Sequence, residues 1–277
     1  MTPSRPLPLL MVAPNGARRG KADHKALPIT LEETVETAVA CQRAGADGLH
    51  LHVRDTDGKH SLDTGLYREA IAALQHAAPG LFLQVTSEAA DCYGPDAQRA
   101  MIRELRPPSV SVALREMLCA STEADNARAF YAWAHDDGVD VQHIVYTAEE
   151  LRWLLECIDQ ETVPGTHHQL QFVLGSYGGS VLPRPRDLEA FLAPLGARKA
   201  DLTFDWMVCA FGSAETACLA HAAALGGKVR VGFENSLWNA DGSLARDNAA
   251  RVAEIRAVLD ETAFVGSAHG ESTRLGH

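Results

Sequence analysis

Residues 48–85 read GLHLHVRDTDGKHSLDTGLYREAIAALQHAAPGLFLQV and contain two short apolar runs separated by a longer amphipathic one. The apolar runs lie at residues 48–53 and 81–85, and residues 65–76 carry the period of a helix. A strand, a helix and a second strand in this order predict a βαβ unit with parallel strands.

The same alternation continues on both sides of this unit. Further strand-like runs lie at residues 7–13, 109–114, 141–146, 170–174, 202–208 and 228–233. Helical runs lie at residues 31–44, 96–105, 122–135, 148–158, 186–192, 213–225 and 244–259. Thr30 and Glu33 form the sequence pattern of a capping box at the start of the first helix. Eight strands, each followed by a helix, predict a (β/α)₈ TIM barrel as a single domain over residues 1–277.

Composition narrows the classes of function. The 277 residues are 46% hydrophobic and carry a formal net charge of -11, which disfavours a generic partner such as nucleic acid or a membrane surface. The six cysteines are scattered without a C-x-x-C pair, so we expect a reducing cytoplasm and no thiolate metal site. No apolar stretch approaches the roughly 18 residues of a membrane span.

Two histidines lie at the end of the run at residues 48–53. Residues two apart in a strand point to the same face, so His50 and His52 are expected inside the barrel, with Leu51 packed outward. Active sites of such barrels lie at the carboxyl ends of the strands. Two neighbouring imidazoles there indicate a divalent metal site, although two buried, hydrogen-bonded core histidines fit this pattern equally well.

A carboxylate follows the last predicted strand at the same end of the barrel. The segment from Arg230 to Asn235 places Glu234 at the barrel mouth. Two histidines and one carboxylate with an open position form a recognised catalytic zinc arrangement. We therefore predict that His50, His52 and Glu234 hold Zn²⁺ or another divalent metal. The alternative for Glu234 is a loop carboxylate that only forms a salt bridge with Arg230.

Five segments, in order along nearly the whole chain, resemble the β-keto acid cleavage enzymes, whose founding activity is 3-keto-5-aminohexanoate cleavage. They are APNGA at 13–17, LPIT at 27–30, HLHVR at 50–54, FVLG at 172–175 and GGKVRVGFE at 226–234. The resemblance implies a (β/α)₈ barrel whose metal, usually zinc, is bound by the two histidines and the glutamate. It also implies that acetyl-CoA is the co-substrate, and that a β-keto acid is converted by a retro-Claisen step into acetoacetate and a new acyl-CoA.

The resemblance also implies roles for other residues. Thr86 occupies the position of a family serine that assists proton transfer, and Arg230 matches the arginine of the same proton-transfer group. Ser111 occupies the position of a family threonine that contacts the substrate. Asn235 stands where many members have an aspartate that pairs with the arginine, and an amide cannot carry that negative charge. We keep Asn235 among the catalytic residues but expect an altered proton-transfer network.

Other departures indicate a divergent substrate. Residues 86–89, TSEA, replace a Ser-Thr-Gly-Gly stretch, and residues 210–213, AFGS, replace a Gly-x-Gly-Arg one. We place Ser87 among the substrate-binding residues. Arg18 lies where the member that cleaves an amino-bearing keto acid has a glutamate. If Arg18 faces the pocket, it favours a second carboxylate or an uncharged polar group and disfavours an ammonium. The alternative is that Arg18 points outward and Arg19 or neither faces the pocket.

The phosphates of CoA need local cations in this acidic chain. Arg184 and Arg186 follow the glycine-rich loop after the sixth predicted strand, and Arg18, Arg19 and Lys21 follow the first. Backbone N–H groups and cations of such loops can bind phosphates, although these residues fit solvated loop charges equally well.

Three functions fit the sequence, and the leading one is the acyl-transferring cleavage of a β-keto acid. A metal-dependent aldolase or hydrolase on the same barrel would not need acetyl-CoA. A non-catalytic barrel would bind metal and small molecule without turnover. We expect a cytoplasmic homo-oligomer, either a dimer or a tetramer, with no nucleic-acid or membrane partner.

Overall fold

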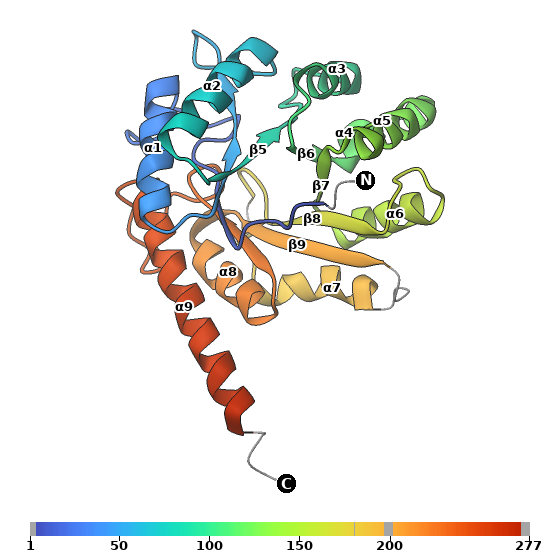
Figure 1. The fold of residues 1–277 in the computed structure, drawn as a ribbon. Coiled ribbons are helices and arrows are strands. Elements are labelled where there is room, and N and C mark those ends of the chain that lie inside the picture. The colour runs from blue at the N-terminus through green and yellow to red at the C-terminus, as the bar shows by residue number, and fades with distance from the viewer. Residues whose placement is uncertain (1–3, 180, 197–201, 273–277) are drawn as a thin grey trace.

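Eight parallel strands form a closed barrel in the computed structural model, which describes residues 4–179, 181–196 and 202–272. The barrel order is β1-β10-β9-β8-β7-β6-β5-β2, and Figure 1 shows the helices around it. This architecture confirms the predicted (β/α)₈ TIM barrel. The predicted domain of 1–277 extends beyond the described residues at both ends. The barrel strands are β1 (Leu10–Val12), β2 (Gly48–Leu51), β5 (Phe82–Thr86), β6 (Ser109–Ala113), β7 (Asp140–Val145), β8 (His167–Leu174), β9 (Thr203–Ala210) and β10 (Lys228–Val231).

Helices follow the barrel strands as the alternation predicts. They are α1 (Leu31–Arg43), α2 (Thr64–Ala77), α3 (Pro95–Leu105), α4 (Leu114–Met117), α5 (Ala124–Asp137), α6 (Ala148–Asp159), α7 (Glu189–Gly196), α8 (Glu215–Ala224) and α9 (Asn248–Ser272). The predicted capping box of α1 is confirmed, because Glu33 N donates to Thr30 Oγ1 and Thr30 N donates to Glu33 Oε2, each at 3.2 Å. In the described part of the chain, no helix is long and apolar enough to cross a membrane.

The apolar core lies between the barrel strands and the helices, whereas the barrel interior contains buried amides. Leu51 and Val85 belong to the apolar core, as predicted for Leu51. Gln84 lies between two apolar residues of β5, so its side chain points the opposite way, into the barrel interior. Gln84 Nε2 donates to Gln142 Oε1 at 2.9 Å, and Gln142 Nε2 donates to the Leu170 carbonyl at 3.3 Å. This amide chain gives the interior below the site a fixed set of hydrogen bonds.

The second predicted strand is shorter than the apolar run at residues 48–53 indicates. The barrel strand β2 ends at Leu51, and β3 (Val53–Arg54) pairs instead with β4 (His60–Ser61) as an antiparallel hairpin. The Asp55 carboxylate closes the connecting turn by accepting from the backbone N–H groups of Asp57 and Lys59, at 2.9 and 2.8 Å. His52 therefore lies between two strands rather than inside one.

The last helix begins later than the predicted range of 244–259. Leu244 forms an isolated antiparallel bridge with Trp238, and α9 begins at Asn248. Asp247 caps this helix by accepting from the Ala250 N–H at 2.8 Å. Figure 1 shows α9 lying beside α1, and the two helices are in contact.

Candidate metal centre and active site

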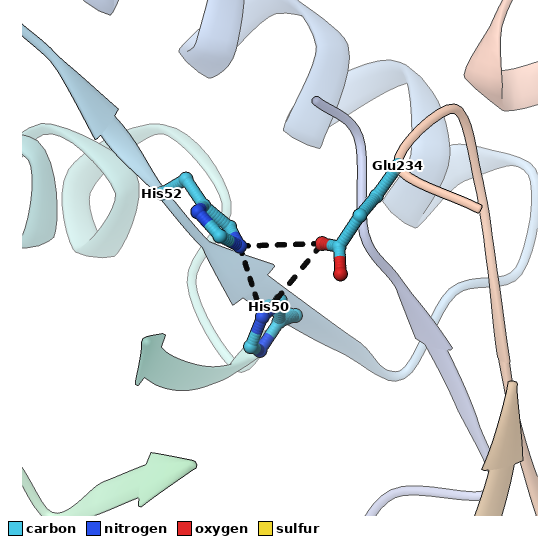
Figure 2. A group of neighbouring side chains, drawn as sticks. All are labelled: His50, His52 and Glu234. Carbon is cyan, nitrogen blue, oxygen red and sulfur yellow. Dashed lines mark hydrogen bonds and ion pairs between the residues drawn. The ribbon is translucent and has the colours of Figure 1, made fainter. Parts of the chain in front are cut away.

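Three buried donor groups converge at the carboxyl end of the barrel strands, as Figure 2 shows. His52 Nε2 lies 3.2 Å from His50 Nε2 and 3.3 Å from Glu234 Oε2, and His50 Nε2 lies 3.7 Å from the same oxygen. Tetrahedral ligands at about 2.0–2.1 Å from zinc are roughly 3.3–3.4 Å apart, so these spacings fit one bound ion. Within the described ranges, this is the one group of His, Cys, Asp or Glu side chains compact enough to hold a metal.

The barrel interior fixes the tautomer of His50. Because Gln84 Nε2 donates to Gln142, its Oε1 is the acceptor that faces His50 Nδ1 at 2.9 Å. The proton of His50 therefore lies on Nδ1, and Nε2 presents a lone pair toward the other two donors. Burial, with a smaller contribution from Arg230, lowers the pKa of His50 to about 3. The imidazole is thus neutral, which is the form that binds metals.

One carboxylate oxygen of Glu234 faces Arg230, and the other faces the two histidines. Arg230 donates to Glu234 Oε1 at 2.8 Å and to Asn235 Oδ1 at 3.2 Å. Although burial alone would raise it, Arg230 and the two histidines hold the pKa of Glu234 well below its usual value. The salt bridge with Arg230 therefore coexists with an orientation that presents Oε2 to His50 and His52. Asn235 keeps a hydrogen bond to the guanidinium without adding a negative charge.

A cavity of about 740 Å³ lies over these donors. Besides His50 and Glu234, the residues predicted for the site that line it are Arg18, Thr86, Ser111, Arg230 and Asn235. They come from the carboxyl ends of β5, β6 and β10 and from the loop after β1, which are distant in sequence. The structure therefore brings the predicted catalytic residues together around one cavity beside the donor atoms.

Three predicted substrate-binding residues lie outside the cavity lining. Ser87 is buried, and its hydroxyl donates to the Ser111 carbonyl at 2.9 Å. Arg184 and Arg186 are exposed, and Arg184 forms an ion pair of 3.2 Å with Asp187. Contacts of these three residues with substrate or CoA stay predictions.

Comparison with known proteins matches this chain to one family along most of its length. The family model of the beta-keto acid cleavage enzymes covers residues 9–265. The chain belongs to the beta-keto acid cleavage enzyme family. The resemblance inferred from the sequence is therefore confirmed.

Named members of the family differ in substrate. The 3-oxoadipate:acetyl-CoA acetyltransferase of Cupriavidus necator is 27% identical over 259 residues, which cover 91% of this chain and 88% of that protein. The 3-keto-5-aminohexanoate cleavage enzyme of Fusobacterium nucleatum is 27% identical, covering 87% of this chain and 86% of that enzyme. The 3,5-dioxohexanoate:acetyl-CoA acetone transferase of Paraburkholderia graminis is 24% identical, with 91% and 89% covered.

Solved structures support the fold. ObcA in binary complex with oxaloacetate superposes with a TM-score of 0.65 at 16% identity, and the match covers 86% of this chain. The chain spans about 64% of the length of ObcA. A type I 3-dehydroquinate dehydratase from Clostridium difficile gives a TM-score of 0.60 at 13% identity, with 93% of both chains covered. At these identities the likeness is one of fold alone.

Several cavity residues of this beta-keto acid cleavage enzyme were missed by sequence reasoning. They are Glu88, Arg115, Glu116, Tyr146 and Tyr177. Burial raises the pKa of Glu88 and that of Glu116, and Glu88 Oε2 lies 3.9 Å from His52 Nε2. The sequence did contain a signal for these residues, because each of them ends a predicted strand or follows its carboxyl end within a few residues.

Two arginines connect the histidine-bearing segment to the loop that carries the glutamate. Arg54 donates to the carbonyls of Gly16 and Arg19 in the loop after β1. Arg19 in turn donates to the carbonyls of Phe233 and Asn235, at 2.5 and 3.4 Å, on either side of the glutamate. This chain of contacts therefore fixes the spacing between donors that come from different strands.

Replacing Arg19 by methionine should weaken metal binding about 10-fold, because removing support for a ligand typically costs 10- to 100-fold in affinity. Competition with a chromophoric chelator measures this affinity. The control is Arg43→Met, which removes an exposed arginine from the last turn of α1. An unchanged affinity in Arg19→Met would show that the loop keeps its position without this residue.

Proposed function

We propose that this chain is a metal-dependent β-keto acid cleavage enzyme that converts a β-keto acid and acetyl-CoA into acetoacetate and a new acyl-CoA. The observation that carries the proposal is the convergence of His50, His52 and Glu234 on one point, with His50 and Glu234 lining the cavity, in a chain that belongs to this family. The names of relatives that use acetyl-CoA support the co-substrate.

The donor set fits a divalent ion, because two imidazoles and one carboxylate are the ligands of known catalytic zinc sites. The lone pair of His50 Nε2 and the free Oε2 of Glu234 face the same point. When bound there, the metal supplies a Lewis acid that polarises the ketone oxygen of the substrate. We infer that this metal is zinc.

The side chains around this point can hold the substrate and move a proton. Thr86 Oγ1 accepts from the Glu88 N–H at 3.1 Å, which leaves its own proton available to the cavity. Ser111 is buried, and its hydroxyl has no hydrogen-bond partner in the described structure. We propose that both hydroxyls contact the β-keto acid. The Arg230 guanidinium, with Asn235 beside it, compensates negative charge that develops in the reaction.

The CoA moiety of the co-substrate is proposed to reach the cavity from its rim. Arg184 and Arg186 follow β8 and are exposed to solvent, where they remain accessible to phosphate groups. The thioester end would then enter the cavity while the nucleotide end stays outside.

Arg18 is proposed to set the charge of the accepted substrate. Its guanidinium lines the cavity, 2.7 Å from Asp91 and 3.9 Å from Glu88. Asp91 is largely exposed, so a substrate carboxylate can replace it as the partner of Arg18. The name of the Cupriavidus relative includes the dicarboxylate 3-oxoadipate, which supports a substrate with a second carboxylate.

Reversing this charge by Arg18→Glu should move the preference toward an amino-bearing β-keto acid by at least about 10-fold in kcat/KM, because like charges in a partly desolvated pocket repel. The measurement compares one anionic and one amino-bearing β-keto acid in wild type and variant. A wild-type preference for the amino-bearing acid, or a ratio that the substitution leaves unchanged, would contradict this role.

Turnover of a panel of β-keto acids tests the proposed function. Each acid is incubated with the protein with and without acetyl-CoA, and acetoacetate is quantified. We expect acetoacetate only when acetyl-CoA is present. Cleavage without acetyl-CoA would instead support an aldolase or hydrolase, and binding without turnover of any acid would support a non-catalytic barrel.

The cellular setting remains a proposal. All six cysteines are free, which supports a reducing cytoplasm. The dimer or tetramer and the single domain over residues 1–277 stay predictions.

A further inference from the structure

The cavity contains a buried hydroxyl that the proposed mechanism leaves unused. Tyr177 follows β8 in the loop at residues 175–179, and its side chain lines the cavity. Its oxygen is buried and has no hydrogen-bond partner in the structure as described. Because buried polar atoms are nearly always hydrogen-bonded, an unpaired hydroxyl inside a catalytic cavity points to a ligand as its partner.

The ring of Tyr177 is held from several sides. The Phe211 ring packs edge-on against it, with 4.6 Å between the centroids. The guanidinium carbons of Arg18 and Arg19 lie 5.7 and 5.8 Å from its centroid, within the range of a cation–π contact. The hydroxyl therefore has a fixed direction before any substrate binds, which favours a catalytic use over a mobile surface role.

Gly16 brings this hydroxyl close to the donor group. A β-carbon at Gly16 would lie 2.9 Å from the Tyr177 oxygen and 2.5 Å from Glu234 Cγ. The φ angle of Gly16 is +62°, a conformation that side chains rarely adopt. The glycine thus leaves room for the tyrosine hydroxyl and the glutamate to approach the same point.

We propose that Tyr177 is a catalytic residue whose hydroxyl donates a hydrogen bond to an oxygen of the bound β-keto acid that gains negative charge as the carbon–carbon bond forms or breaks. This inference rests on the proposed function. The phenol keeps its proton throughout, so no atom or charge is transferred to or from Tyr177. A preorganised donor stabilises the transition state more than the ground state, because the charge on that oxygen increases during the reaction.

Tyr177→Phe tests the proposal because it removes only the oxygen. We expect kcat to fall about 100-fold, as for the loss of one oxyanion donor, while KM and the metal content change little. With the metal removed from both proteins, Tyr177→Phe should unfold at the same temperature as wild type or at a higher one, since the lost hydroxyl had no partner in the protein. A structural role would instead lower this temperature.

Tyr131→Phe is the matched control. Tyr131 in α5 is also buried, and its hydroxyl also has no partner among the described residues, but it lies outside the catalytic cavity. We expect wild-type kcat for this variant. A kcat of Tyr177→Phe within threefold of wild type, an equal loss in Tyr131→Phe, or a loss of metal from Tyr177→Phe would overturn the proposal.

A binding experiment separates this inference from the proposed function. Acetohydroxamate, a small anionic analogue of an enolate, is titrated into the Co²⁺-loaded protein and followed by the cobalt absorption spectrum. We expect about 10-fold weaker binding to Tyr177→Phe than to wild type. If wild type forms no acetoacetate but shows this difference, the proposed function fails and the donor role stands. Equal binding to both proteins overturns the donor role.

Discussion

His52→Ala should lose its metal on dialysis and form acetoacetate at less than about 1% of the wild-type rate, because only two of the three protein ligands remain. The donor distances support this expectation, since His52 Nε2 lies nearest to both other donor atoms, at 3.2 and 3.3 Å. Elemental analysis of the dialysed protein and an acetoacetate assay measure the two effects.

The control for this variant is His76→Ala, which removes an exposed histidine from the last turn of α2. We expect that protein to retain its metal and its turnover. If His52→Ala retains as much metal as wild type, the donors described here are buried core histidines and the metal site is wrong.

Arg230→Ala should abolish measurable turnover, with a loss of at least about 1,000-fold, while metal content at saturation stays intact. Arg230 donates to Glu234 Oε1 and Asn235 Oδ1, whereas the Glu234 oxygen that faces the histidines is Oε2. A bound divalent ion would still neutralise the charge of Glu234. Removing the Arg230 guanidinium should therefore mainly destabilise the transition state. Single-turnover assays and elemental analysis separate these effects.

Arg152→Ala is the control, because Arg152 is exposed and forms an ion pair with Glu149, three residues earlier. It should retain both activity and metal. Loss of metal from Arg230→Ala would show that the arginine mainly supports Glu234 and does not act on the reaction.

The barrel was predictable because strand and helix periods alternate along the chain, and each run corresponds to an observed element. Boundaries were less predictable. The apolar alternation around His52 continues past Leu51, so pattern alone gives no reason to end β2 there. The end is set by the hairpin of Val53–Arg54 with His60–Ser61, which depends on the turn at Asp55.

The donor group was predictable because each member lies near the carboxyl end of a predicted strand. Side-chain directions in loops were not predictable. Arg18 and Arg19 are adjacent in sequence, yet Arg18 lines the cavity and Arg19 binds backbone carbonyls. Thr86 and Ser87 diverge in the same way, because only Thr86 faces the cavity. The role of Gln84 in fixing the His50 tautomer depends on a contact between different strands, which a single sequence does not reveal.

Metal reconstitution of the stripped protein tests the central claim most directly. The chelator-treated protein is titrated with Zn²⁺, and acetoacetate formation from a β-keto acid and acetyl-CoA is followed at each addition. We predict no activity without metal and a linear rise that ends at one equivalent per chain, since the described residues provide one site. Full activity in the metal-free protein, or a rise that continues well beyond one equivalent, would contradict a single catalytic metal held by His50, His52 and Glu234.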